Sequence, residues 1–259
     1  MELNYRFEDN GSEETVLLLH GFLADMSSME TAGAHLWEHF NILLVDLPGF
    51  GDTKAGGDYR MDDVSDAIAA LISSRWGAVH IIGYSMGGRV AVSLLASYPG
   101  MIKSAVLESA SPGISDPTAR KARQKLDRER ADSILTDYVS FIDGWERMGL
   151  FQSQDSVEED QKARQRENRL AQKPAGAAES LINYGTGIQQ SYWQDLPEIS
   201  IPVLLLAGEK DGKFVTINQK MEELLPNGRL EIIPGAGHNI HMEAADKFGI
   251  MVLEFLIGG

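Results

Sequence analysis

Short, continuously apolar runs alternate along the chain with segments whose apolar residues recur at helical spacing. The apolar runs lie at 15–20, 41–46, 79–84, 104–108, 202–208 and 229–234, written TVLLLH, NILLVD, VHIIGY, SAVLE, PVLLLAG and RLEIIP. Most are apolar at consecutive positions, a pattern typical of strands buried on both faces of a parallel sheet. The alternating stretch LNYRF at 3–7 favours an antiparallel edge strand.

Helical patterns separate several of these runs. They cover 62–74, 87–98, 221–225 and 243–256. Strand and helix in regular alternation indicate a doubly wound, mostly parallel sheet with helices on both faces. The fold class that we predict is therefore α/β.

This alternation stops after residue 114 and resumes at residue 196. The intervening residues 115–195 are helix-forming, charged and poor in strand signals. We interpret them as a helical cap inserted into a core formed by 1–114 and 196–259, and not as an independent domain. A chain of 259 residues is long enough for one large core of this kind.

The charge of the chain is strongly acidic and unevenly distributed. The formal net charge is -15 at pH 7, which argues against nucleic acid and anionic membrane surfaces as partners. Yet 12 of the 23 lysines and arginines fall between Ser115 and Asp195. Most of them fit a solvated helical surface with i,i+4 ion pairs, and a few are candidates for contact with an anionic ligand.

Composition also narrows the chemistry. The chain has no cysteine, which excludes disulfides, thiolate nucleophiles and thiolate metal sites. No apolar stretch approaches the roughly 20 residues that span a bilayer. The first residues, MELNYRFEDNG, lack the basic start and the apolar core of a signal peptide. We therefore expect a cytoplasmic protein.

One serine lies between glycines where a predicted strand meets a predicted helix. In IIGYSMGGR, residues 81–89, Gly83 and Gly87 allow the two segments to approach closely around a strained turn. Ser85 would then stand at the carboxyl edge of the sheet with a reactive hydroxyl. The alternative is a serine that serves only as the N-cap of the helix.

A reactive serine needs a histidine base, and the histidine needs an orienting carboxylate. Asp211 comes just after PVLLLAG and His238 follows RLEIIP on a glycine-flanked turn, so both fall at carboxyl ends of strands. Their order after the serine is the one expected for this arrangement. Glu108, which also ends a strand, is a rival for the acid. His238 and His241 have a spacing that suits a metal pair, but no third ligand lies nearby in the sequence.

The stretch LLLHGF, residues 17–22, offers a partner for the negative charge that such a reaction develops. His-Gly after a strand opens a loop whose backbone N–H groups can point toward an oxyanion. The expected donors are the amides of Phe22 and Met86. A simple strand-ending turn is the alternative interpretation.

These motifs together resemble a known superfamily. HGF, DLPGFG, GYSMGG, GEKD and AGH are similar to the motifs of α/β hydrolases across essentially the whole chain. That resemblance implies the α/β-hydrolase fold and no particular reaction. The serine at position 85 argues against the haloalkane dehalogenases and epoxide hydrolases of this fold, which use an aspartate nucleophile.

Further motifs follow one another in the order GYSMGGR, LESASPG, ARQKLDR, WERMGLF, RENRLA, GTGIQQSYW and GEKDGKF. Jointly they resemble the 2-succinyl-6-hydroxy-2,4-cyclohexadiene-1-carboxylate synthases of menaquinone biosynthesis. This resemblance implies a carbon–oxygen lyase that removes pyruvate from a small tricarboxylate, 2-succinyl-5-enolpyruvyl-6-hydroxy-3-cyclohexene-1-carboxylate. It implies no metal ion and no organic cofactor, and it does not indicate an oligomeric state.

Arginines are the expected partners of the substrate carboxylates, because their forks suit planar anions better than lysines do. Arg89 lies four residues after Ser85, hence on the same helical face. Arg123 and Arg166 match cap arginines of the family. The alternatives are a structural pairing of Arg89 with a core carboxylate, and simple solvation of Arg123 and Arg166.

Further candidates near the site carry less specific signals. Trp145 could wall the pocket from the cap side, although a tryptophan at helical spacing is more often core packing. Tyr84 stands beside the serine, and Lys213 in GEKDGKF lies near the expected entrance. Met29, in the loop after HGF, replaces an aromatic residue that is more usual in the family and could alter the shape of the pocket.

Two rival functions stay open. A serine hydrolase of a small carboxylated ester, thioester or diketone would form an acyl-enzyme at Ser85. A non-catalytic ligand receptor on the same fold would gain nothing from an intact triad and an oxyanion loop.

Overall fold

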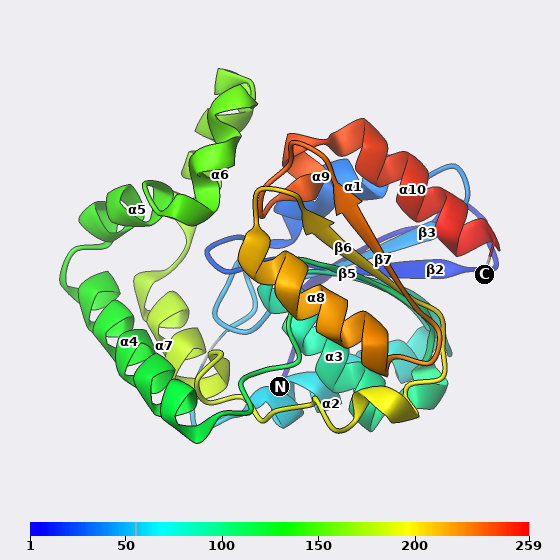
Figure 1. Ribbon diagram of the computed structural model, residues 1–259, viewed down its shortest axis with the longest axis horizontal. Coiled ribbons are helices and arrows are strands. Elements are labelled where there is room, and N and C mark those ends of the chain that lie inside the picture. Colours follow the sequence, from blue (N-terminus) through cyan, green and yellow to red (C-terminus); the bar gives the residue numbers. More distant parts are fainter. Residues whose placement is uncertain (55, 259) are drawn as a thin grey trace.

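A seven-stranded sheet forms the centre of the computed structural model, which describes residues 1–54 and 56–258 (Figure 1). The strand order is β1-β3-β2-β4-β5-β6-β7; β1 runs antiparallel to β3 and the other pairs are parallel. All six predicted apolar runs form strands, and LNYRF contributes the predicted antiparallel edge. The strands are β1 (Tyr5–Glu8), β2 (Thr15–Leu19), β3 (Asn41–Val45), β4 (Val79–Tyr84), β5 (Ile102–Glu108), β6 (Val203–Gly208) and β7 (Gly228–Ile233).

Burial explains why most of the strands are continuously apolar. Every residue of β2, β3, β4 and β6 is buried. Successive side chains alternate between two cores, because side chains of a strand point to opposite faces of its sheet. Leu17 and Leu19 pack in one core, and Val16 and Leu18 pack in the other. The sheet therefore needs a helical layer on each face.

Helices cover both faces of the sheet (Figure 1). On one face the core includes α2 (Met61–Arg75), α3 (Met86–Ser97) and α8 (Gly212–Leu224). On the other it includes α1 (Glu30–Ala34), α9 (Ile240–Glu243) and α10 (Ala245–Gly258). The predicted helices 62–74 and 87–98 correspond to α2 and α3.

Two helical predictions had the wrong extent. The pattern at 221–225 is only the last part of α8, which begins at Gly212. The pattern at 243–256 spans a break at Ala244, whose φ of -145° lies outside the helical range, so α9 and α10 are separate helices.

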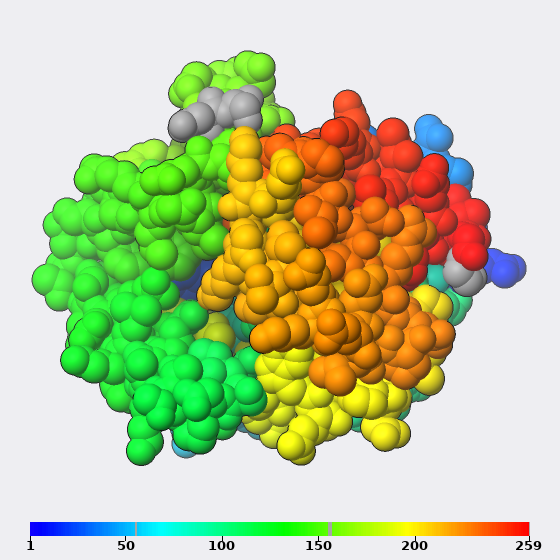
Figure 2. Space-filling model, viewed as in Figure 1, coloured from blue at the N-terminus to red at the C-terminus, as the bar shows by residue number. Residues whose placement is uncertain are grey.

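A helical cap lies between β5 and β6 in the chain. Its helices fall within the range 115–195 that the sequence predicts for an inserted cap, and the limits of that insertion stay a prediction. Figure 2 shows a hollow where the green cap meets the yellow and orange segments of the core. The cap elements are α4 (Pro117–Thr136), α5 (Tyr138–Glu146), the 3-10 helix η3 (Gly149–Ser156), α6 (Glu159–Ala171) and α7 (Pro174–Tyr184).

Short 3-10 helices complete the fold: η1 (Met26–Met29), η2 (Pro99–Met101) and η4 (Leu196–Glu198). None of the helices in the described part of the chain is long and apolar enough to cross a membrane.

Candidate active site

Ser85 occupies a strained turn between β4 and α3. Its backbone has a φ of 50° and a ψ of -100°, values that a residue other than glycine rarely adopts. Its N–H donates to the Glu108 carbonyl oxygen at 2.9 Å, which ties the turn to β5. A Cβ at Gly83 would lie 2.6 Å from the Gly87 carbonyl oxygen, so the turn requires glycine there. Within the described residues, the Ser85 hydroxyl makes no capping hydrogen bond to α3, contrary to the N-cap alternative.

The structure brings the serine, the histidine and the aspartate together in one hydrogen-bonded chain. His238 Nε2 lies 2.9 Å from Ser85 Oγ, and His238 Nδ1 lies 2.6 Å from Asp211 Oδ2. Because an ionised carboxylate only accepts, Nδ1 carries the proton and Nε2 accepts from the Ser85 hydroxyl. Asp211 and His238 are 7% and 3% exposed, so little water competes for these bonds.

Each candidate acid has its own histidine. Glu108 is bonded to His241 at 2.7 Å, and Asp211 to His238. Asp211 is also the N-cap of α8, where its Oδ1 accepts from the Phe214 N–H at 3.4 Å. In the part of the chain that the structure describes, no group of three or more His, Cys, Asp or Glu side chains is arranged to hold a metal ion.

His20 fixes the loop that follows β2. Its buried imidazole donates from Nδ1 to the Gly21 carbonyl oxygen at 2.8 Å, and its Nε2 accepts from the Leu47 N–H at 2.9 Å. Burial lowers the pKa of His20, which favours the neutral tautomer that these bonds require. Phe22 on this loop and Met86 at the start of α3, the expected oxyanion donors, border the same cavity as the serine. The Met86 N–H belongs to the first turn of α3, where N–H groups lack intrahelical partners, so it is available for such a role.

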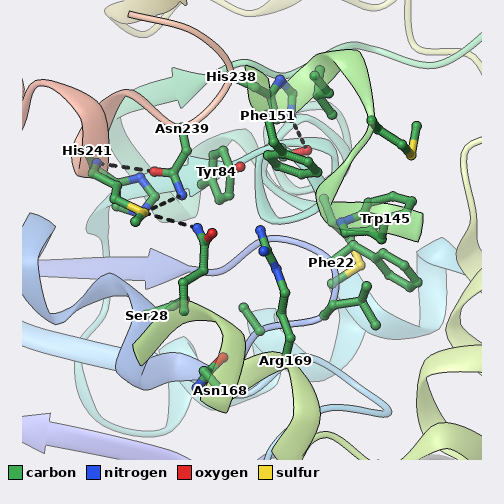
Figure 3. Close-up of a pocket in the computed structure, with 18 of the residues that line it drawn as sticks. Phe22, Ser28, Tyr84, Trp145, Phe151, Asn168, Arg169, His238, Asn239 and His241 are labelled. Atoms are coloured by element: carbon green, nitrogen blue, oxygen red, sulfur yellow. Dashed lines mark hydrogen bonds between the residues drawn. The ribbon is translucent and has the colours of Figure 1, made fainter. Parts of the chain in front are cut away.

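A cavity of about 610 Å³ opens beside the serine, between the core and the cap (Figure 3). Its lining carries six basic side chains and, among the described residues, one acidic side chain, Glu30. Glu30 is itself paired with Arg6 at 2.7 Å. On a chain with a net charge of -15, this cavity is a cationic compartment. The basic residues are Arg89, Arg123, Arg130, Arg164, Arg169 and Lys213.

Arg89 is a buried cation whose hydrogen-bond partners are neutral. Its Nη1 donates to the Tyr184 carbonyl oxygen at 2.9 Å and to Gln189 Oε1 at 2.5 Å. Within the described ranges, no ion pair joins Arg89 to a carboxylate. The alternative of a structural ion pair between Arg89 and a core acid is therefore not supported. Burial, and then the nearby Arg123, lower the pKa of Arg89 to about 10, which leaves it protonated at neutral pH.

Two arginines share one carboxylate, and Lys213 lies near both of them. Asp127 accepts from Arg123 at 2.7 Å and lies 3.9 Å from Arg130. Burial, and then Arg123, lower the pKa of both Arg130 and Lys213. Because Asp127 offsets only part of this positive charge, an anionic ligand would be stabilised here.

Arg166 does not line the cavity within the described residues, contrary to the expectation from sequence. Its guanidinium is paired with Glu146 and Asp143 on α5. Arg169, three residues further along α6, occupies the cavity position instead and is 7% exposed. Figure 3 shows its side chain extending toward Tyr84, and it also binds Glu146 at 3.0 Å. Arg166 is therefore placed to hold Glu146 and Asp143, outside the described lining of the cavity.

Arg130, Arg164 and Arg169 are the cavity cations that sequence reasoning missed. Arg130 lies seven residues after Arg123 on α4, which places both on one helical face, so a signal for it was present. For α6 the motif RENRLA contains both Arg166 and Arg169, and spacing alone does not show which one faces the cavity.

Aromatic rings form part of the cavity wall. The Trp145 ring lies 5.2 Å from the Phe22 ring, and the Arg130 guanidinium lies 5.2 Å from the centre of Trp145. Tyr84 also lines the cavity. From its place in the sequence, Met29 was expected to alter the shape of the pocket. It is instead fully buried in the core and outside the described lining.

Comparison with known proteins agrees with this architecture. The family model described as the alpha/beta hydrolase fold matches residues 14–245. Together with the parallel sheet and the strained serine turn, this match defines the class of protein as an α/β hydrolase fold.

Within that class, this chain is similar in both sequence and structure to one group of enzymes in particular. A Bacillus subtilis (strain 168) protein with the provisional name 2-succinyl-6-hydroxy-2,4-cyclohexadiene-1-carboxylate synthase is 40% identical, over 98% of this chain and 95% of its own. The synthase of that name from Serratia proteamaculans (strain 568) is 26% identical, over 93% and 92% of the two chains. The solved structure of MenH from S. aureus has a TM-score of 0.94 at 34% identity and covers 98% of both chains. The chain belongs to this synthase family.

Proposed function

We propose that this chain is a lyase of menaquinone biosynthesis that releases pyruvate from 2-succinyl-5-enolpyruvyl-6-hydroxy-3-cyclohexene-1-carboxylate. The ring product is 2-succinyl-6-hydroxy-2,4-cyclohexadiene-1-carboxylate, the compound for which its relatives are named. The observation that carries the proposal is the lining of six basic side chains around a cavity that also contains Ser85. A substrate with three carboxylates is complementary to such a lining.

The reaction begins with removal of a proton from C2, the ring carbon that carries the succinyl side chain. The adjacent carbonyl acidifies this C–H bond, because the electron pair left behind becomes an enolate. Ser85 and His238 act together as the base, since Ser85 Oγ lies 2.9 Å from an imidazole nitrogen that can take its proton. Asp211, 2.6 Å from the other imidazole nitrogen, stabilises the imidazolium that forms.

The negative charge that develops on the carbonyl oxygen needs a donor. The amides of Phe22 and Met86 fill this role in the proposal, since both residues border the cavity beside Ser85. As the C–O bond at C5 to the enolpyruvyl group breaks, the enolate electron pair forms the C2=C3 double bond and the existing C3=C4 double bond shifts to C4=C5, which gives the conjugated diene. The departing enolpyruvate takes a proton and becomes pyruvate, so the reaction consumes no water.

Four basic side chains place the substrate. Arg89, Arg130 and Lys213 each interact electrostatically with Arg123, and Asp127 pairs with Arg123 and Arg130. Carboxylates bound among them would relieve this mutual repulsion and gain charge-assisted hydrogen bonds. Arg169 supplies a further cation near Tyr84, on the side of the cavity shown in Figure 3.

The test is a direct assay of both products. Purified protein given the enolpyruvyl cyclohexene tricarboxylate should release pyruvate, measured with lactate dehydrogenase, at the rate at which a conjugated diene appears in the near ultraviolet. Ser85→Ala should lower both rates together by about 1,000-fold or more. Turnover of esters or thioesters without pyruvate release would overturn the proposal.

A serine hydrolase of small carboxylated esters is the second candidate, because the same triad geometry supports acyl transfer. It predicts a covalent acyl-Ser85 that mass spectrometry of the quenched reaction would detect. The lyase predicts unmodified Ser85 throughout turnover.

A further inference from the structure

A second buried carboxylate–imidazole pair lies beside the triad. Glu108, the last residue of β5, is 0% exposed, and His241 in α9 is 3% exposed. Glu108 Oε2 lies 2.7 Å from His241 Nδ1, and Oε1 accepts from the His241 backbone N–H at 3.0 Å. Both carboxylate oxygens of Glu108 are thus hydrogen-bonded to His241, and two such bonds fix the orientation of His241 relative to β5.

The same glutamate also holds the serine. Its backbone carbonyl oxygen accepts from the Ser85 N–H at 2.9 Å. His241 lies three residues after His238, whose Nε2 is 2.9 Å from Ser85 Oγ. A closed ring of contacts therefore runs from Ser85 to His238, along the chain to His241, across to Glu108, and back to Ser85.

Tyr84 fills the space inside this ring. Its side chain lies 5.5 Å from the His238 ring and 4.9 Å from the His241 ring, measured between centroids. Figure 3 shows Tyr84 next to both histidines. Packing of one rigid aromatic ring against both imidazoles limits how far the two can shift independently.

We propose that Glu108 is a positioning residue that acts through His241 to set the distance between Ser85 Oγ and His238 Nε2. One side of that hydrogen bond is fixed by the backbone of Glu108 and the other by its side chain. Without the Glu108–His241 contact, one link fewer would hold the segment that carries His238 to the strained turn of Ser85. This idea deepens the proposed function, since it rests on Ser85 and His238 acting as a pair.

The length of the Glu108 side chain is what the first experiment changes. Glu108→Asp keeps the charge but withdraws the carboxylate by about 1.5 Å, one C–C bond. Glu108→Gln keeps the length. Its amide oxygen can still accept from the His241 backbone N–H, and its amide N–H can donate to His241 Nδ1 if the imidazole adopts the tautomer protonated at Nε2. Positioning therefore predicts that Asp impairs the site and Gln does not, whereas a role of charge alone predicts the reverse.

The readout is the second-order rate at which diisopropyl fluorophosphate phosphorylates Ser85 and releases fluoride. This rate reports on the hydroxyl and its base, and it requires no pyruvate elimination. We expect Glu108→Asp to label about 10- to 100-fold more slowly than the unaltered protein, and Glu108→Gln to label within about threefold. In the elimination assay, Glu108→Asp should lower kcat by a similar factor and leave KM nearly unchanged.

His241 provides an independent pair of variants. The side-chain amide of Asn places an N–H where His Nδ1 stands, so His241→Asn should label nearly as fast as the unaltered protein, and His241→Leu should label slowly. Equal loss in both variants would point to the ring or to Nε2 and would overturn the proposal. If His241→Leu fails to fold, as judged by circular dichroism, the two Glu108 variants still decide.

Glu14→Asp is the matched control. Glu14 also faces a buried histidine, His80 at 3.6 Å, but at the opposite end of β4 from the serine turn. It should leave the labelling rate unchanged. Labelling by Glu108→Asp at the control rate would overturn the positioning role. Normal labelling of the unaltered protein without pyruvate release would instead refute the proposed function and leave the positioning test intact.

Discussion

Arg89, on core helix α3, donates a hydrogen bond at 2.9 Å to the backbone carbonyl oxygen of Tyr184, the last residue of cap helix α7. A buried guanidinium thus joins core and cap through a neutral acceptor. Burial lowers its pKa to about 10, so the guanidinium stays protonated at neutral pH but carries a desolvation cost. An anionic ligand in the cavity would compensate the positive charge of Arg89. Mutation of Arg89 therefore tests whether the cavity binds an anion.

Arg89→Met should separate activity from stability. The methionine keeps most of the packing volume and removes the buried charge. We expect kcat/KM for the elimination to fall at least about 30-fold, because loss of one buried charged partner costs about 2 to 5 kcal/mol. The midpoint of thermal unfolding should stay at or above that of the unaltered protein, since an uncompensated charge leaves the interior. Steady-state kinetics and calorimetry measure the two effects, and unchanged kinetics would refute the role of Arg89 in binding.

Arg169 and Arg166 form a matched pair for mutation. Both contact Glu146, but only Arg169 lines the cavity within the described residues. Arg169→Met should raise KM about tenfold or more, whereas Arg166→Met should change it by less than about threefold. Substrate-dependence curves for the two proteins, prepared side by side, test this difference. The opposite ranking would restore the assignment made from sequence alone.

Asp211→Asn should leave the fold intact and remove most of the activity. Its amide can still contact His238, but it favours the tautomer whose Nε2 carries the proton and cannot accept from Ser85. We expect kcat to fall by about 1,000- to 10,000-fold, by analogy with other triads. Pyruvate accumulated over long incubations at high enzyme concentration provides the sensitivity that such low rates require. A loss below about tenfold would show that Asp211 is not the orienting acid.

His20 makes stability depend on pH with a defined sign. Burial lowers its pKa in the folded chain, so the unfolded chain binds more protons as pH falls. The stability that neutral His20 supports is complete above the ordinary histidine range, near pH 6.5, and is lost as pH falls below it. Urea unfolding at a series of pH values should show a decline for the unaltered protein that is shallower in His20→Gln, by up to about 1.4 kcal/mol per pH unit. Parallel curves would contradict this expectation.

The three residues of the proposed triad could be predicted from sequence because each follows a recognisable apolar run. Ser85, Asp211 and His238 lie after β4, β6 and β7, and the carboxyl ends of parallel strands meet at one edge of a sheet. Their convergence follows from topology, and topology was readable from the spacing of strands and helices.

The cap was less predictable, because the rotation of each cap helix depends on contacts with the rest of the fold. RENRLA offers two arginines, and only the packing of α6 against α5 decides that Arg166 meets Asp143 and Arg169 meets the cavity. The break between α9 and α10 at Ala244 could not be predicted from sequence, because no glycine or proline lies at that position. The pairing of Glu108 with His241 could not be predicted either, because the two residues lie 133 positions apart in the chain and only the fold brings them together.

The excess of basic groups around the cavity has a consequence for biochemistry at the bench and in the cell. Phosphate, sulfate and citrate, as well as small dicarboxylic metabolites, carry negative charge that would compensate the basic side chains of the cavity that Asp127 leaves uncompensated. We expect such ions to compete with the substrate for the cavity, so that an apparent KM measured in a phosphate or citrate buffer combines substrate binding with displacement of the buffer anion.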